Sequence, residues 1–141
     1  MTLHTGSCLC GGVRFTLTAP IESIQVCHCG QCRKAQGTAL ATNAPVARSA
    51  FSLDAGDALL SAYESSPGKR RVFCRVCGSP VYSERDTLPG VLRIRLSLIN
   101  GDIEAPLEAH CHVADKANWW PLLDDGALRF PGGSDASPSV K

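Results

Sequence analysis

Short alternations of apolar and polar residues dominate the chain, and most of them end at a glycine, a proline or a small polar residue. In GGVRFTLTAP, the side chains of Val13, Phe15 and Leu17 share one face of an extended segment, which ends at Pro20. The same character recurs in SIQVC, TALATNAPV, FSLD, ALLSAY, RRVF, PVYSE, LRIRLSLI and AHCHVA. Only GQCRKAQG suits a helix, of at most a turn or two before Gly37. The pattern predicts a mainly β fold with short irregular connections.

Turns and termini define the expected domain organisation. The stretch ESSPGKRR predicts a turn between two strands, with Pro67 and Gly68 supplying the turn chemistry. The chain has 141 residues, no internal repeat and no linker between two cores, so we predict one domain over residues 5–132. The closing stretch GGSDASPSVK is poor in apolar residues, which predicts a flexible tail over 133–141.

Charge and cysteine content narrow the function classes. Lysine and arginine number 14 against 13 aspartates and glutamates, so the chain lacks the basic balance that nucleic acids and anionic membranes select. No apolar run approaches the length of a membrane span, and the first residues lack a signal-peptide pattern, so we expect a cytoplasmic protein. In a reducing compartment, eight cysteines point to metal binding or catalysis rather than to disulfides.

Spacing sorts the cysteines into two pairs, one trio and one single residue. The pairs are Cys8 with Cys10 and Cys74 with Cys77, the trio is Cys27, Cys29 and Cys32, and the single residue is Cys111. CRVCG is a zinc-knuckle sequence, because two intervening residues let both sulfurs face one ion while the next glycine lets the backbone turn. The other pair, in CLCGG, is also followed by glycines. We therefore predict a structural zinc site formed by Cys8, Cys10, Cys74 and Cys77; a disulfide or buried apolar thiols remain the alternative.

The trio in CHCGQC then lacks an obvious fourth protein ligand. Three protein ligands and one open position are typical of catalytic zinc sites, so Cys27, Cys29 and Cys32 predict such a site. Three thiolates favour capture of a further thiol, which would be a nucleophile at neutral pH. Alternation along an extended segment turns His28 away from its neighbours, and a role for His28 as the fourth ligand stays open as the alternative. Arg33 and Lys34 could steady the surplus negative charge or a substrate carboxylate, or be solvated surface charges.

Other residues have less specific patterns. We expect Cys111 to be a small buried residue of a strand, with a fourth-ligand or redox role left open. His110 and His112 flank it on the opposite face and are either acid–base groups near the second zinc or ordinary core and surface histidines.

Aromatic and basic clusters complete the candidates. We expect Trp119, Trp120 and Phe130 to pack in the core, with one tryptophan as a possible pocket wall. Lys69, Arg70 and Arg71 could meet substrate carboxylates or phosphates.

Five stretches in this order resemble the glutathione-dependent formaldehyde-activating family, which includes the centromere protein V domain: GSCLCGGVRF, CHCGQCRKAQGTAL, YESSPGKRRVFCRVCGSPVY, HCHVADKANWW and DDGALRFPG. The resemblance covers residues 6–132. It implies a single-domain β-tent fold with two zinc ions as the only cofactors, one structural and one catalytic, with the two cysteine sets above in those roles. It also implies S-(hydroxymethyl)glutathione synthase activity on glutathione and formaldehyde.

Two functions of different class follow. The first is a zinc-dependent carbon-sulfur lyase or thiol adduct synthase that captures a thiol such as glutathione and adds it to an aldehyde. The second is a non-catalytic zinc-binding module that contacts nucleic acid or protein through GKRR and CRK. The near-neutral charge counts against nucleic acid, and the open trio favours the enzyme.

Overall fold

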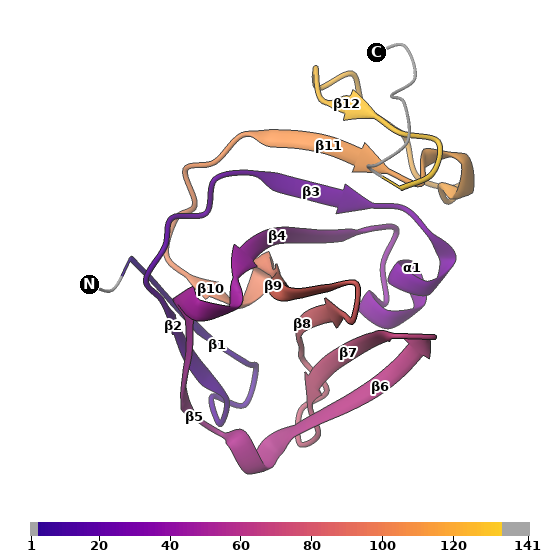
Figure 1. The fold of residues 1–141 in the computed structure, drawn as a ribbon. Coiled ribbons are helices and arrows are strands. Elements are labelled where there is room, and N and C mark those ends of the chain that lie inside the picture. The colour runs from indigo at the N-terminus through magenta and orange to yellow at the C-terminus, as the bar shows by residue number, and fades with distance from the viewer. Residues whose placement is uncertain (1–2, 134–141) are drawn as a thin grey trace. The chain divides into compact units, whose positions relative to one another are not determined.

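The computed structural model describes residues 3–133, which fall into two compact units. Among these residues, the first unit comprises 3–22 and 44–104, and the second comprises 23–43 and 105–133. Strands outnumber helices in both units, which confirms the mainly β prediction (Figure 1). The single domain over 5–132 stays a prediction, and the predicted tail, 133–141, lies outside the described residues except for its first position.

The first unit contains an antiparallel sheet with the strand order β10, β1, β2, β5. Its strands are β1 (His4–Ser7), β2 (Arg14–Leu17), β5 (Phe51–Ala55) and β10 (Ile99–Asn100). Val13, Phe15 and Leu17 are at most 1% exposed, so the face predicted from their alternation is confirmed. The Phe15 ring stacks on Phe51 with the ring centroids 5.1 Å apart. This sheet places Cys8 and Cys10 directly after β1.

The same unit contains an antiparallel run of four consecutive strands: β6 (Leu60–Ser66), β7 (Lys69–Cys74), β8 (Pro80–Arg85) and β9 (Leu88–Arg95). The predicted turn between β6 and β7 is confirmed, and Gly68 adopts a φ of 76° there. Val72, Val81, Leu92 and Ile94 are buried in this part of the core. Strand β7 ends at Cys74, which is one residue of the predicted knuckle.

Short helical turns interrupt the strands of the first unit: η1 (Arg48–Ala50), η2 (Asp57–Leu59) and η3 (Leu96–Leu98). The expectation of one strand over LRIRLSLI is wrong, because η3 divides it into β9 and β10. The break allows Ile99 to pair with Gly6 on β1, while Leu96 and Leu98 are buried in the turn itself.

In the second unit, β11 (Leu107–Cys111) lies parallel to both β12 (Leu128–Arg129) and β3 (Ile24–Cys27). The first residues of β4 (Ala41–Ala47) pair antiparallel with β3. Between β3 and β4 comes α1 (Gly30–Gln36), the only α-helix in the described part of the chain, and η4 (Val113–Asp115) follows β11. Gly37 ends α1 with a φ of 70°, as the glycine position predicted.

The aromatic residues near the C-terminus divide between core and surface. Phe130 is 8% exposed and packs with Ala109 and Cys111, so its predicted place in the core is confirmed. The expectation that Trp119 and Trp120 are core residues is wrong, because they are 63% and 45% exposed. They follow η4 in a segment that forms no strand, so neither tryptophan is part of a sheet. No helix in the described range 3–133 is long and apolar enough to cross a membrane.

Candidate metal centres

The first unit brings four cysteines together, and they are the four that spacing had grouped: Cys8, Cys10, Cys74 and Cys77. Their Sγ atoms all lie within 4.8 Å of one another, with 3.5 Å between Cys8 and Cys10 and 3.9 Å between Cys10 and Cys74. A tetrahedral ion with bonds of about 2.3 Å to sulfur has sulfur-to-sulfur edges of about 3.8 Å. None of the eight cysteines, all of which lie in the described residues, forms a disulfide, and the spacing of this cluster fits a metal ion.

Two tight turns present these thiols. The Gly11 amide donates to the carbonyl oxygen of Cys8 at 3.0 Å, and the Gly78 amide donates to that of Cys74 at 2.7 Å. Both glycines have a positive φ, of 76° and 78°, a conformation that residues with a side chain rarely adopt. The knuckle geometry predicted from CRVCG is therefore present in the backbone.

Hydrogen bonds to sulfur favour the thiolate form at part of this cluster. The Ser79 hydroxyl accepts from the Leu9 amide at 3.0 Å and from the Cys77 thiol at 3.3 Å, and a Cys77 thiolate would accept the Ser79 hydrogen instead. This hydrogen bond lowers the pKa of Cys77 to about 5. The Val13 amide donates to Cys8 Sγ at 3.2 Å. The surroundings of Cys8 and Cys77 thus stabilise the sulfur anion, which is the form that binds a metal, whereas the neighbouring thiols raise the pKa of Cys10 to about 11.

The second unit brings the trio together. Cys27 ends β3, Cys29 caps the N-terminus of α1, and Cys32 lies in the first turn of that helix. Their Sγ atoms also lie within 4.8 Å of one another, and the Cys32 amide donates to Cys29 Sγ at 3.3 Å. The hydrogen bonds with Cys29 and Cys32 raise the pKa of the Cys27 thiol well above its usual range, because clustered sulfurs resist accumulating negative charge. A divalent cation would remove that penalty, so the donor set fits a metal ion.

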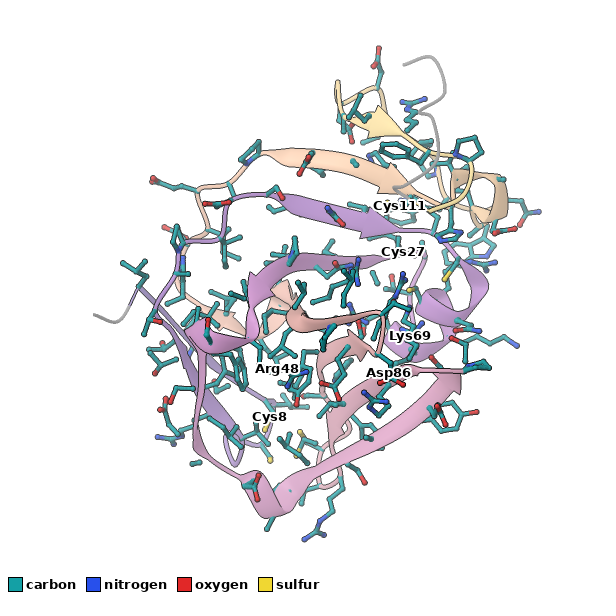
Figure 2. All side chains as sticks on the ribbon, viewed as in Figure 1. Cys8, Cys27, Arg48, Lys69, Asp86 and Cys111 are labelled. Carbon is teal, nitrogen blue, oxygen red and sulfur yellow. The ribbon has the colours of Figure 1, made fainter. Side chains whose placement is uncertain are left out.

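Neither His28 nor Cys111 completes the trio. His28 points to the opposite face, where its Nε2 lies 2.9 Å from Nδ1 of His110, as strand alternation predicted. Cys111 is the register partner of Cys27 on the parallel strand β11, and Figure 2 labels the two on these neighbouring strands. Cys111 is nevertheless outside the set of three mutually close ligand atoms and packs with Ala109 and Phe130. In the described residues the trio remains a set of three.

Two buried histidines and a partly exposed aspartate form a polar chain that the sequence did not reveal. His28 and His110 are 0% and 5% exposed, and Nε2 of His110 lies 2.7 Å from Oδ2 of Asp125. Burial, and then the nearby charges of His110, Lys116 and Arg33, lowers the pKa of His28 to about 4. The hydrogen bond from His110 lowers the pKa of Asp125. The second flanking histidine, His112, leaves the strand with a φ of 57°, so the expected symmetric placement is wrong.

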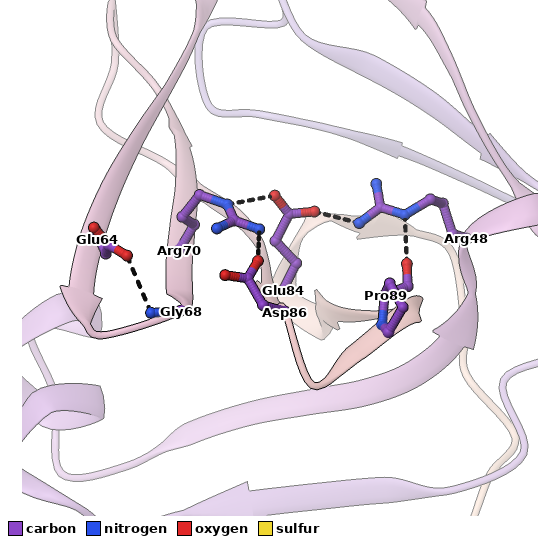
Figure 3. Close-up of polar contacts among 7 residues, drawn as sticks. All are labelled: Arg48, Glu64, Gly68, Arg70, Glu84, Asp86 and Pro89. Carbon is purple, nitrogen blue, oxygen red and sulfur yellow. Dashed lines mark hydrogen bonds and ion pairs between the residues drawn. The ribbon is translucent and has the colours of Figure 1, made fainter.

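The arginines proposed to bind anions donate to other parts of the protein. Arg33 donates through Nε to the His28 carbonyl at 3.3 Å and through Nη2 to the Asp115 carbonyl at 3.2 Å. Arg70 pairs with Glu84 at 3.0 Å and with Asp86 at 2.8 Å, as Figure 3 shows.

The remaining basic candidates differ in exposure. Arg71 is 7% exposed and donates to the Ser65 hydroxyl at 3.0 Å. Lys69 is half-buried and Lys34 is exposed. Of the five predicted cations, Lys34 is the one that the fold leaves on the surface.

Comparison with known proteins identifies one family that this chain resembles over most of its length. A family model described as glutathione-dependent formaldehyde-activating enzyme matches residues 3–115. A Halomonas elongata protein named "putative glutathione-dependent formaldehyde-activating enzyme" is 30% identical over 132 residues, which cover 83% of this chain and 79% of the relative.

A solved structure supports the fold. The crystal structure of a Rhodobacter sphaeroides structural-genomics target superposes with a TM-score of 0.60 at 24% identity, over 73% of this chain and 98% of that one. The family match covers most of the chain and includes both cysteine sets. The chain therefore belongs to the glutathione-dependent formaldehyde-activating enzyme family.

Proposed function

We propose that this protein is a zinc-dependent carbon-sulfur lyase or thiol adduct synthase of the S-(hydroxymethyl)glutathione synthase type. The observation that carries the proposal is the contrast between a set of four cysteines and a set of three. Four thiolates close a tetrahedral site, whereas three leave one position for a substrate. The names of the family and of the Halomonas relative point to glutathione as the thiol and formaldehyde as the aldehyde.

The two sets would have different roles. Cys8, Cys10, Cys74 and Cys77 would hold a structural zinc that ties the residues after β1 to the end of β7. Cys27, Cys29 and Cys32 would hold a catalytic zinc, which, when bound, supplies acidity that keeps a thiol as thiolate at neutral pH.

The chain's own residues shape the site around the trio. The amide of Cys32 withdraws charge from the Cys29 sulfur, and the helix cap fixes the directions of both side chains. In the proposed reaction, the S–H bond of the thiol breaks and its sulfur bonds to the aldehyde carbon. The carbonyl oxygen takes up the proton, so thiol and aldehyde give a hydroxymethyl thioether with no other reactant. The reverse reaction cleaves the same carbon-sulfur bond.

A pair of cysteine variants tests the proposal. We expect two zinc ions per wild-type chain and one in Cys32→Ser, which should retain the fold. In this variant, the rate of adduct formation in excess of the uncatalysed rate should fall at least about 100-fold. Cys77→Ser should instead lose the other zinc and unfold. The assay follows free thiol on mixing glutathione with formaldehyde, beside elemental analysis and circular dichroism. If Cys32→Ser retains full turnover, or unfolds as readily as Cys77→Ser, the trio is no catalytic site.

The non-catalytic module has little support from the basic residues. Arg33 and Arg70 are engaged within the protein, and the net charge is +1. We therefore expect no binding to a generic oligonucleotide at low salt, measured by fluorescence anisotropy.

A further inference from the structure

We propose that the hydrogen-bonded chain Asp125, His110 and His28 positions the segment that carries the three-cysteine site. These residues are positioning residues, since none of them is among the three close ligand atoms of the trio. The inference builds on the proposed function in so far as the trio holds a metal ion. It assigns to the C-terminal part of the second unit, and to Asp125 in particular, a role in shaping that site.

The direction of the hydrogen bonds follows from the carboxylate end. Asp125 is itself held, because its Oδ1 accepts from the Ala127 amide at 3.1 Å. Its Oδ2 accepts from Nε2–H of His110 at 2.7 Å, and an imidazole ring that carries a single proton then has Nδ1 as its acceptor. Nε2–H of His28 then donates to that Nδ1 at 2.9 Å. The carboxylate therefore selects the tautomer and the rotation of both buried rings.

His28 is the residue between two members of the trio, and its backbone is held as well. Its amide donates to the Cys111 carbonyl at 3.0 Å, and its carbonyl accepts from Arg33 Nε at 3.3 Å. The peptide groups that join His28 to Cys27 and to Cys29 are thus anchored, and the side chain is a third anchor. A change in the backbone torsions of His28 would move the Cα atoms of both cysteines, and a ring that is held in place restrains those torsions.

Stability alone does not account for this polar chain. Nδ1 of His28 is buried and has no hydrogen-bond partner in the described part of the protein. An unsatisfied buried polar atom destabilises the fold, and an apolar side chain of similar size would avoid that cost. Partners that orient residues around a metal site typically change metal affinity by about 10- to 100-fold. Positioning of the trio explains why an incomplete polar chain occupies this place.

Three variants of adjacent aspartates test the inference in the full-length protein. Asp125→Ala removes the acceptor, Asp125→Asn keeps an acceptor oxygen for His110, and Asp124→Asn is the matched control at an exposed neighbour. Metal affinity is measured for each cysteine set by zinc competition with a chromogenic chelator, and the cobalt-substituted protein gives the thiolate-to-cobalt bands.

We expect Asp125→Ala to weaken metal binding at the trio at least about 10-fold and to shift its cobalt bands, with the four-cysteine site unchanged. Asp125→Asn should retain most of the affinity, and Asp124→Asn all of it. The inference is overturned if Asp125→Ala binds metal at the trio like the wild type, or weakens both sites equally.

A metal-independent measurement separates this inference from the proposed function. If the wild-type trio binds no metal, the proposed function fails, and amide hydrogen exchange decides on the positioning role. Asp125→Ala should then speed exchange at the amides of His28 and Cys32 at least about 10-fold, with the amides of β7 and β8 unchanged. Equal exchange in Asp125→Ala and wild type would overturn the inference.

Discussion

Gly6 lies where β1 passes over the ring of Phe15, its register partner on β2. A Cβ atom at Gly6 would be 2.1 Å from Cζ of that ring, which is 1% exposed and stacks on Phe51. Gly6→Ala should therefore lower the free energy of unfolding by about 1–3 kcal/mol, as overpacking does. Gly90→Ala is the control, since nothing lies within 4 Å of its Cβ position. Urea denaturation of both variants is the measurement, and equal stability would contradict the overlap.

Cys111 is the residue whose role the sequence left most open. It is 8% exposed, packs with Ala109 and Phe130, and stands outside the trio's three close ligand atoms. Cys111→Ala should therefore leave the metal content of the wild type unchanged and lower stability by about 1 kcal/mol through the lost sulfur. Elemental analysis with thermal unfolding checks both values. A drop of one metal ion per chain would identify Cys111 as a fourth ligand.

At the scale of elements, ion pairs link η1 to the strands β7 and β8 of the first unit (Figure 3). Glu84 accepts from Arg48 and Arg70, and Arg70 also donates to Asp86. Although desolvation opposes it, pairing with the two arginines lowers the pKa of Glu84. A carboxyl group with a lowered folded pKa stabilises the fold above its unfolded pKa, and this contribution is lost as pH falls through the folded pKa.

Glu84→Gln should accordingly be less stable than the wild type at pH 7, by about 0.5–1 kcal/mol, and the difference should shrink as pH falls below about 4.5. Asp86→Asn is the control: this carboxylate is 63% exposed and pairs with Arg70, so we expect a smaller effect. Urea denaturation of the three proteins across this pH range is the measurement. A difference that stays constant with pH would show that the carboxylate charge of Glu84 is not the cause.

Strands with one apolar and one polar face were predictable from the sequence. Strands held only by pairing with neighbouring strands were not. Alternation placed β2, and the glycine after GQCRKAQ ended α1 at the right residue. HTGS, which forms β1, has no apolar alternation, and it is a strand because β2 and β10 pair with it on both sides. The break in LRIRLSLI escaped prediction for the same reason, since Ile99 changes partner to β1. Local pattern carries no information about a distant partner strand.

At the scale of the whole chain, the cysteine sets were predictable because spacing within each pair is local and only one closed set of four was available. The polar chain behind the trio was not, because His28 and His110 are 82 positions apart and meet only through the parallel pairing of β3 with β11. Arg33 shows the same limit, since its partner Asp115 is also 82 positions away. The candidate donors could be predicted from the sequence, and the residues that hold them in place could be identified only from the fold.

The two cysteine sets close loops of very different length, which predicts that metal removal proceeds in two steps. The four-cysteine set joins Cys10 to Cys74, 64 positions apart, whereas the trio spans only Cys27 to Cys32. Since a metal that closes a long loop removes more freedom from the unfolded chain, the first set should contribute more to stability.

We expect increasing chelator to release zinc first from the three-ligand trio with little change in circular dichroism, and then from the four-cysteine set together with unfolding of the first unit. Zinc release followed by a chromogenic chelator, beside far-ultraviolet circular dichroism, measures both steps, and Cys32→Ser should show only the second. Release of both ions in one step that coincides with unfolding would mean that the trio is as closed and as structural as the set of four.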